Sequence, residues 1–229
     1  MATVLSSRDV DVTKLIYQKP KVNAQGGQSV FLNYDHGGNA GKLVVQTPRM
    51  NLPFGVSSYE KDNGTVQYDL QLSFRGEDSN PKIAKFRDVV EELDEKHLTT
   101  AVENSELWFK KNMKMEVLEE LFKSQLKDSK DGKYAPTMKV KLPYSKSGEP
   151  TFEVYNSKRE EVTVKEIVKG CEVVALIECT GLWFVNKNFG CSWKLVQAKV
   201  FKPERVSGYS FKDENSEEEV SEEEDEIDN

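Results

Sequence analysis

The chain has 229 residues with 37% hydrophobic and 10% aromatic residues, a composition that suits one globular domain with a real core. Its longest apolar run, residues 173–177, is far too short to cross a bilayer, and its first nine residues do not have the pattern of a secretory signal. Three cysteines, none in a Cys-x-x-Cys pair, predict buried reduced thiols rather than a zinc site. We therefore expect an intracellular protein without a membrane span.

The first third of the chain is expected to form strands. Residues 28–34 and 42–47 are rich in apolar side chains and flank the glycine-rich segment 35–41, which predicts a flexible hairpin loop. The run 65–74 then alternates without error between apolar and polar residues, as a half-buried strand does. Its apolar face would carry Val66, Tyr68, Leu70, Leu72 and Phe74.

A helical insertion at about 80–127 interrupts these strands. Ser79-Asn80-Pro81 is typical of a helix start, because proline costs little in the first turn, where its missing N–H has no helical partner. The apolar residues that follow at helical spacing are Ile83, Phe86, Val90 and Leu93. A second helix is predicted from about Met115 to Leu126.

Strands return after the insertion. Residues 138–144 alternate so that Lys139 and Lys141 point outward, and Phe152 with Val154 indicates a short strand. Three further strands are expected at 171–180, 182–187 and 192–201, separated by Gly181 and by a turn at 188–190. The order of elements predicts a mainly β fold, a small antiparallel barrel or sandwich with an α excursion.

Catalytic motifs are missing from the sequence. The only histidines, His36 and His97, are predicted at the surface, and neither lies near a motif. The segment 37–43 has the wrong spacing and the wrong strand-to-strand context for a phosphate-binding loop. We therefore predict a protein that is not an enzyme, with no cofactor and no metal.

Aromatic and basic residues alternate in the run 181–194. Its members are Trp183, Phe184, Lys187, Phe189, Trp193 and Lys194. Proteins that hold single-stranded nucleic acid need this mixture, because bases stack on flat rings while lysines follow the phosphates. The competing interpretation is that these rings belong to the core. Alternation from 196 to 200 places Trp193 on the outer face, so Trp193 is predicted to be the exposed ring. Further predicted DNA contacts are Arg49, Arg75, Trp108, Lys110, Lys111, Lys139, Lys141 and Lys199.

The last segment, 213–229, contains 11 acidic residues and no basic residue. The remaining 28 acidic residues stand against 32 lysines and arginines, so residues 1–212 carry about +4 while the whole chain carries −7. We expect domain 1–212 to bind an anion and tail 213–229 to be disordered and to compete for the same site. The alternative is a tail that only aids solubility. Its predicted regulatory residues are Asp213, Glu214, Glu217, Glu218, Glu219, Glu222, Glu223, Glu224, Asp225, Glu226, Ile227 and Asp228.

Three segments, 45–50, 53–56 and 190–200, together with the acidic tail, carry a family resemblance. The chain resembles the phage T7-type single-stranded DNA-binding proteins and their counterparts in large nucleocytoplasmic DNA viruses, including those of algae. The resemblance implies an oligonucleotide-binding (OB) barrel with an inserted helix, acting in viral DNA replication, recombination and repair. It also implies a tail that occupies the DNA groove until DNA displaces it.

In that family the tail also recruits replication proteins, which would here be a DNA polymerase, primase or helicase. A homodimer and a location in the host cytoplasm (a viral factory) or nucleus are further expectations. One departure concerns the tail, which ends Ile227-Asp228-Asn229, whereas the phage tail ends in an aromatic residue.

Two other classes of protein fit the same charge pattern. A histone-chaperone-like protein would use the acidic tail itself to bind basic proteins, so deleting the tail would weaken binding instead of tightening it. A virion or scaffold protein with a solubilising tail would bind neither partner. The basic body and its aromatic-lysine pairs favour single-stranded DNA.

Overall fold

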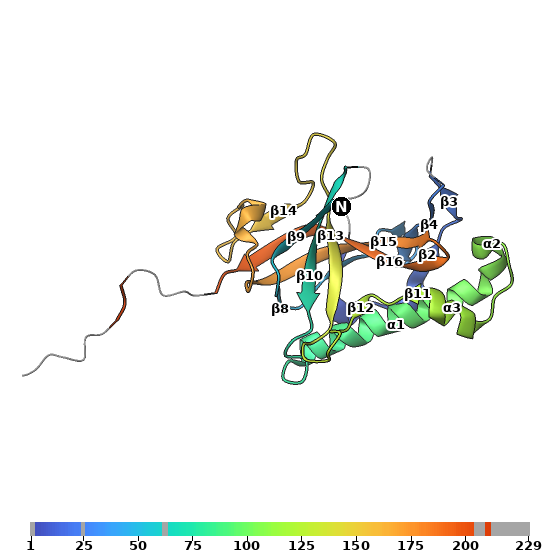
Figure 1. The fold of residues 1–229 in the computed structure, drawn as a ribbon, viewed down its shortest axis with the longest axis horizontal. Helices are drawn as coiled ribbons and strands as arrows, with labels where there is room; N and C mark the ends of the chain where they lie inside the picture. Colours follow the sequence, from blue (N-terminus) through green and yellow to red (C-terminus); the bar gives the residue numbers. More distant parts are fainter. Residues whose placement is uncertain (1–2, 24–25, 61–63, 204–208, 212–229) are drawn as a thin grey trace, which may run out of the picture.

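The computed structural model describes residues 3–23, 26–60, 64–203 and 209–211. It is mainly β, with one large mixed sheet and a helical insertion, which confirms the predicted fold class (Figure 1). The predicted tail 213–229 lies outside the described residues. Among the described helices, none combines the length and the apolar character that a membrane span requires.

Five strands pair with one another in a closed ring. They are β8 (Met50–Asn51), β10 (Val66–Ser73), β13 (Thr137–Leu142), β16 (Asn188–Phe201) and β15 (Glu172–Val185), and β15 pairs back to β8. Closed pairing is what a barrel requires, because it leaves no sheet edge between its members. The finer assignment to the OB fold, a five-stranded barrel, stays a prediction.

Shorter strands extend this ring. Those in the large sheet are β1 (Val4–Ser6), β3 (Lys21–Val22), β4 (Gln28–Val30), β7 (Val44–Gln46), β9 (Val56–Glu60), β11 (Phe122–Lys123), β12 (Leu126–Lys127) and β14 (Glu153–Tyr155). A separate sheet contains β2 (Leu15–Tyr17), β5 (Leu32–Asp35) and β6 (Ala40–Gly41). The predicted hairpin loop exists between β5 and β6, where the His36 amide donates to Asn39 O at 3.0 Å. Short 3₁₀ turns lie at Ser7–Asp9, Val12–Lys14 and Val164–Glu166.

The alternation predicted for β10 and β13 sets the register of the core. The two strands are antiparallel, with Leu70 opposite Val140 and Leu72 opposite Met138, and these four side chains are fully buried. Lys139 lies on the opposite face and is exposed, as predicted. The outer face of β10 and β13 is therefore polar and basic.

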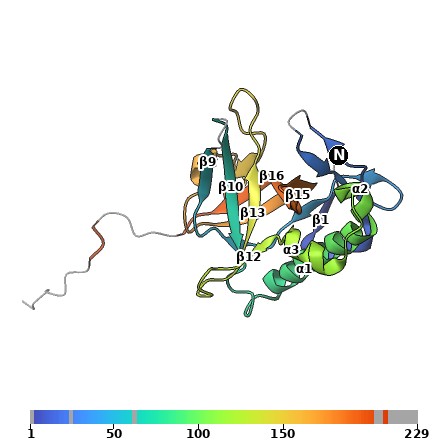
Figure 2. The same cartoon turned by 45° about the vertical axis from the view of Figure 1, so that its right-hand side comes forward.

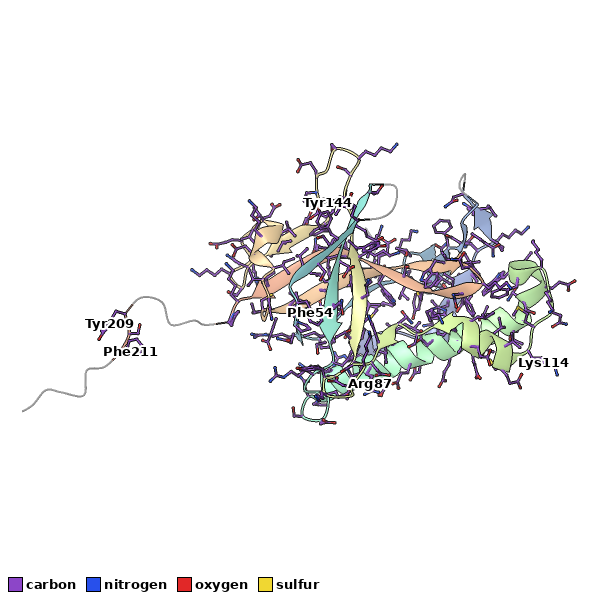
Figure 3. The ribbon with its side chains drawn as sticks, in the orientation of Figure 1. Phe54, Arg87, Lys114, Tyr144, Tyr209 and Phe211 are labelled. Atoms are coloured by element: carbon purple, nitrogen blue, oxygen red, sulfur yellow. The ribbon has the colours of Figure 1, made fainter. Side chains whose placement is uncertain are left out.

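Helix α1 (Pro81–Glu103) begins where the sequence predicts, because Asn80 Oδ1 accepts from the Lys82 amide at 3.1 Å. Its four predicted apolar positions are all buried against the barrel. Figures 1 and 2 show α1 running alongside the barrel. Near its start, Arg87 forms ion pairs with Glu77 (2.6 Å) and Glu91 (2.9 Å) (Figure 3).

The second part of the insertion differs from the prediction. A short helix, α2 (Ser105–Phe109), was not predicted, and α3 (Met115–Leu121) ends five residues before the expected 126. Helix α3 ends there because Phe122 and Lys123 pair with Phe189 and Gly190 of β16 as strand β11. Pairing with a distant strand overrides the local helical pattern.

The C-terminal strands form one long hairpin, so the expected turn at 188–190 was wrong. The turn is formed by Asn186 and Lys187, whose φ angles of 48° and 70° are those of a two-residue hairpin turn. Gly181 does not end a strand either, because β15 continues through it with an irregular register. A Cβ at Gly181 would lie 2.3 Å from Val30 O, so only glycine allows β4 to cross there.

The prediction of a surface His97 was also wrong. His97 lies within α1 and is fully buried, with Nδ1 2.7 Å from the Tyr17 hydroxyl. Burial lowers the pKa of His97 to about 3, so the ring is neutral in the folded protein. His36 is half-buried, and its Nε2 lies 3.0 Å from Lys42 O.

The cysteines fit the predicted reduced thiols. Cys171, Cys179 and Cys191 are free; the first two are buried and the third is half-buried. Cys179 Sγ and Cys191 Sγ lie 3.4 Å apart. Within the described ranges no cluster of three or more His, Cys, Asp or Glu residues is arranged to hold a metal ion.

Candidate nucleic-acid interface

A groove of about 410 Å³ lies where β10, β13 and the β15–β16 hairpin meet β11. Its basic side chains are Lys123, Lys139 and Lys141, and its ring at the surface is Trp183. We call this hollow the lysine groove. It combines positive charge with a flat aromatic surface, which are the two features that a single nucleic-acid strand needs.

Strand register holds two of the three lysines in place. Lys141 lies opposite Asp69 and Lys139 opposite Gln71, on the face of β13 that points away from the core. Lys139 Nζ is 3.3 Å from Asp69 Oδ2, and Lys141 Nζ donates to Ser192 Oγ at 3.0 Å. These contacts hold the two ammonium groups at the groove wall.

Trp183 lies across the backbone of Gly190, its partner on β16. A Cβ at Gly190 would stand 2.9 Å from the indole and 2.8 Å from Lys123 O, so any larger residue would displace the ring. The indole is half-buried and lines the lysine groove. The backbone of Gly190 therefore packs against the indole, and the indole also contacts the lysine groove.

Trp193, predicted to be the exposed ring, is instead buried with 2% of its surface exposed. The cause is a bulge in β16: Ile177 pairs with Leu195 but Leu176 pairs with Gln197, so Val196 is an extra residue. An extra residue reverses which face the alternate side chains occupy. Trp193 and Leu195 are buried before the bulge, and Ala198 and Val200 after it.

A buried hydrogen-bond network holds Trp193 beneath the lysine groove. Its Nε1 donates to Gln125 Oε1, and Gln125 Nε2 donates to Asp94 Oδ1 of α1 at 2.6 Å. The Gln125 amide (3.0 Å) and the Ser124 hydroxyl (2.7 Å) donate to Asp94 Oδ2. Burial raises the pKa of Asp94. The network ties the helical insertion to the floor of the groove.

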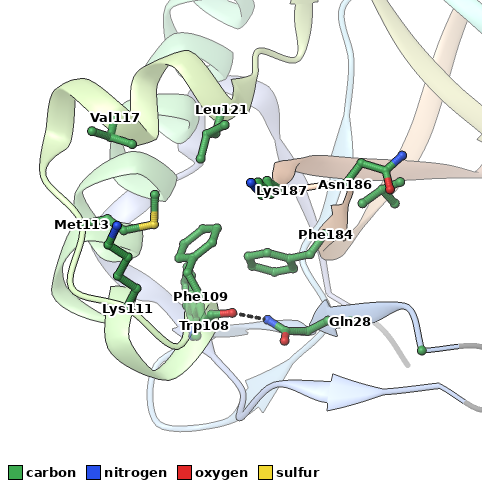
Figure 4. Close-up of a pocket in the computed structure, with 12 residues that line it drawn as sticks. Gln28, Trp108, Phe109, Lys111, Met113, Val117, Leu121, Phe184, Asn186 and Lys187 are labelled. Carbon is green, nitrogen blue, oxygen red and sulfur yellow. Dashed lines mark hydrogen bonds between the residues drawn. The ribbon is translucent and has the colours of Figure 1, made fainter.

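Three other predicted rings lie on the opposite side of the hairpin. Trp108 and Phe189 are buried between the hairpin and the insertion, and Phe184 stacks on Phe189 with centroids 5.8 Å apart at 11°. Phe184, Trp108, Lys111 and Lys187 line a second hollow (Figure 4). We call it the hairpin pocket.

The remaining predicted contacts are scattered. Arg49 is 2.6 Å from Glu172 and lies over the Phe201 ring, and with Arg75 it lines a hollow beside the start of α1. Lys194 pairs with Glu178 at 3.1 Å. Lys199 lies over Phe201, and the exposed Lys110 donates to Leu107 O. The structure thus brings Lys139, Lys141 and Trp183 together in the lysine groove, above the buried Trp193. It gathers Trp108, Lys111, Phe184 and Lys187 in the hairpin pocket and leaves the other predicted contacts elsewhere.

Sequence reasoning missed Lys123 and Gln67, which line the lysine groove. Lys123 reaches the lysine groove only because β11 pairs with β16, a long-range contact without a sequence motif. Gln67 lines the groove, and Tyr59 lies opposite it on β9 with 64% of its surface exposed. The outward positions of the clean β10 alternation were the available signal for Gln67.

Residues 71–214 match the model of DUF5871, a family of unknown function. The chain belongs to the DUF5871 family. The part that matches the DUF5871 model contains all three groove lysines, Trp183 and Gly190.

The comparisons found one relative among curated proteins, the uncharacterized protein L291 of Acanthamoeba polyphaga mimivirus, which is 29% identical over 166 residues. The match covers 71% of this DUF5871 chain but only 26% of L291, so the chain spans about a quarter of the relative's length.

Solved structures with a related arrangement include two phage proteins. The single-stranded DNA-binding protein of bacteriophage Enc34, in complex with single-stranded DNA, has a TM-score of 0.43 and 14% identity, covering 83% of this chain and 98% of that one. The single-stranded DNA-binding protein gp2.5 of bacteriophage T7 has a TM-score of 0.46 and 14% identity, covering 73% and 90%.

Proposed function

We propose that this protein binds single-stranded DNA in the lysine groove. One observation carries the proposal: Trp183, held over Gly190, shares the groove with Lys123, Lys139 and Lys141. Unpaired bases would stack on the indole while the lysines neutralise the phosphates beside them. A duplex would not fit this mode, since its base faces are already stacked on one another.

Replacing Trp183 by alanine is expected to weaken the binding of a short oligothymidylate at low salt by about 1–3 kcal/mol, the value of one stacked base. Trp183→Phe should restore part of the loss, because phenylalanine keeps a flat ring. Fluorescence anisotropy titration measures both. The matched control is Tyr134→Ala, which removes a ring with 76% exposure that does not line the groove. Equal affinities for Trp183→Ala and wild type would reject the groove as the site.

The salt dependence of the same titration tests the lysines separately. Each phosphate neutralised on a single strand contributes about 0.7 to the slope of log K against log salt. Replacing Lys123, Lys139 and Lys141 together by glutamine should reduce that slope by about 2. Glutamine at the exposed Lys110, outside the groove, should leave the slope unchanged.

We propose further that the acidic segment 213–229 competes with DNA for the basic body. A tethered polyanion is present at high effective concentration near its target. Deleting 213–229 should tighten single-strand binding at low salt, and the gain should shrink as salt rises. The control carries the same segment with its acidic residues changed to their amides, which should behave like the deletion. Weaker binding after deletion would favour the histone-chaperone-like alternative, provided that basic proteins lose affinity as well.

The proposed setting is viral DNA replication, recombination and repair, in a viral factory of the host cytoplasm or in the nucleus. The mimivirus relative supports the viral setting. Recruitment of a polymerase, primase or helicase through segment 213–229, and a homodimer, belong to the same proposal. Ile227 is the proposed apolar contact of this segment for such partners.

A further inference from the structure

The hairpin pocket is a hollow of about 530 Å³ between the tip of the β15–β16 hairpin and helices α2 and α3. Its volume is in the range typical of pockets for small ligands. Figure 4 shows the rings of Phe109 and Phe184 side by side, with Val117 and Leu121 on the helical side. The two rings lie 5.4 Å apart at 65°. Both the rings and the aliphatic walls suit a flat, weakly polar group.

Polar groups stand at the border of this apolar space. Lys111 and Lys187 line it and are exposed, so positive charge is placed on both the helical side and the hairpin side. Gln28 also lines it, and its Nε2 donates to Trp108 O at 2.8 Å, which fixes the direction of the amide. The hairpin pocket is therefore apolar inside, with the Gln28 amide and the ammonium groups of Lys111 and Lys187 at its border.

The hairpin pocket and the lysine groove lie on opposite faces of the β15–β16 hairpin and share one lining residue near its tip. Val185 lines both hollows and is 56% exposed between them. Alternation along β15 turns Trp183 toward the groove and the next residue, Phe184, toward the pocket. A strand leaving Trp183 would reach the pocket by passing over the exposed Val185, around the hairpin near its tip.

We propose that the hairpin pocket receives one unpaired base of the strand held in the lysine groove, an inference that rests on the proposed function. The base would stack on Phe184, which is backed by the parallel ring of Phe189. Its amide and carbonyl edge would face Gln28, and Lys111 and Lys187 would hold the flanking phosphates. The shared border with the groove at Val185 favours a base over an apolar side chain of an acidic peptide.

The test fills the pocket instead of removing its walls. Val117 is 44% exposed on α3, so Val117→Trp adds bulk to the pocket without emptying the core. Glu120→Trp is the matched control, since Glu120 is exposed on the same helix and does not line the pocket. Affinity for a short oligothymidylate is measured with and without a single abasic residue at each position, and thermal unfolding confirms that the variants fold.

Wild type and Glu120→Trp should lose affinity about fivefold or more when the abasic residue falls at the position of the pocket. Val117→Trp should bind the intact strand about as weakly as wild type binds that abasic strand, with no further loss at the same position. Lys187→Gln, a milder change at the border, should weaken binding of the intact strand in the same direction.

Other outcomes separate the two proposals. If Trp183→Ala weakens binding and Val117→Trp does not, the pocket inference is overturned while the groove stands. If Val117→Trp binds DNA more tightly, the pocket takes an acidic peptide that competes with DNA, and the inference is again wrong. If neither Trp183→Ala nor Val117→Trp changes the binding of the intact oligothymidylate, the proposed function itself fails.

Discussion

Replacing Trp193 by alanine is expected to lower the free energy of unfolding by about 3–5 kcal/mol, the usual cost of removing a buried tryptophan. The indole is 2% exposed and packs in the main core. Its loss also leaves Gln125 Oε1 buried without its donor, and that amide is part of the network on Asp94. Urea unfolding followed by circular dichroism measures the change.

Trp183→Ala is the matched control for this prediction, because it removes the same side chain from the surface of the same hairpin. The two variants should show opposite profiles: Trp193→Ala loses stability, whereas Trp183→Ala loses DNA affinity and little stability. A stable Trp193→Ala protein with weakened DNA binding would show that Trp193 contacts the strand after all.

The second large effect is a loss of stability in acid that depends on His97. Its pKa is about 3 in the folded protein and about 6.5 in the unfolded chain, because the buried ring cannot accept a charge. The unfolded chain therefore binds a proton first as the pH falls. The stability due to the neutral ring is complete above pH 6.5 and declines by up to about 1.4 kcal/mol per pH unit down to about pH 3.

His97→Phe and His97→Asn isolate this contribution, since neither side chain titrates. The phenylalanine keeps the ring volume, and the asparagine keeps a polar atom near the position of Nδ1 for Tyr17. Urea midpoints from pH 7.5 to 4 should fall less steeply in both variants than in wild type. Asp94, whose raised pKa gives stability that is lost as the pH rises, is present in all three proteins and cancels in the comparison. If the urea midpoints of wild type and of both variants fall equally steeply with pH, His97 lies in a polar environment and this prediction is wrong.

Elements governed by local chemistry followed from the sequence. The Asn80-Pro81 start of α1, its buried stripe and the β10–β13 alternation needed only capping and periodicity. The loop between β5 and β6 followed from its glycines. Such features are decided within one or two turns of chain, where side-chain spacing determines the outcome.

Features that depend on pairing between distant segments could not be predicted from the sequence. The bulge at Val196 places Trp193 on the buried face of β16 instead of the outer face. The residues around Val196 carry no sequence signal for a bulge. The helix expected to reach residue 126 ends at Leu121, because residues 122–123 form strand β11 by pairing with β16. A surface position for His97 rested on its expected place at the end of the helix. Helix α1 continues to Glu103, and His97 has helical spacing with the buried positions Leu93 and Val90.

In the candidate site, the outward direction of Lys139 and Lys141 on β13 could be predicted from the sequence. Which of Trp183 and Trp193 reaches the surface could not. Trp183 is at the surface because Gly190 leaves room for its ring, and that relation exists only once the hairpin has formed. The rings of the run 181–194 divide among the core, the groove and the pocket, and this division depends on the folded hairpin.

The closed ring of strands also has a consequence for the order in which the chain folds. β8 and β10 are made early, but their ring is completed only by β15, which pairs Glu172 with Asn51, and by β16, which pairs Lys194 with Lys141. Contacts between residues so far apart in sequence form slowly, because a long loop must be ordered before any contact compensates for it. During synthesis, the inner faces of the first strands therefore stay open to solvent until the final hairpin emerges from the ribosome, and association with other chains is most probable in that interval.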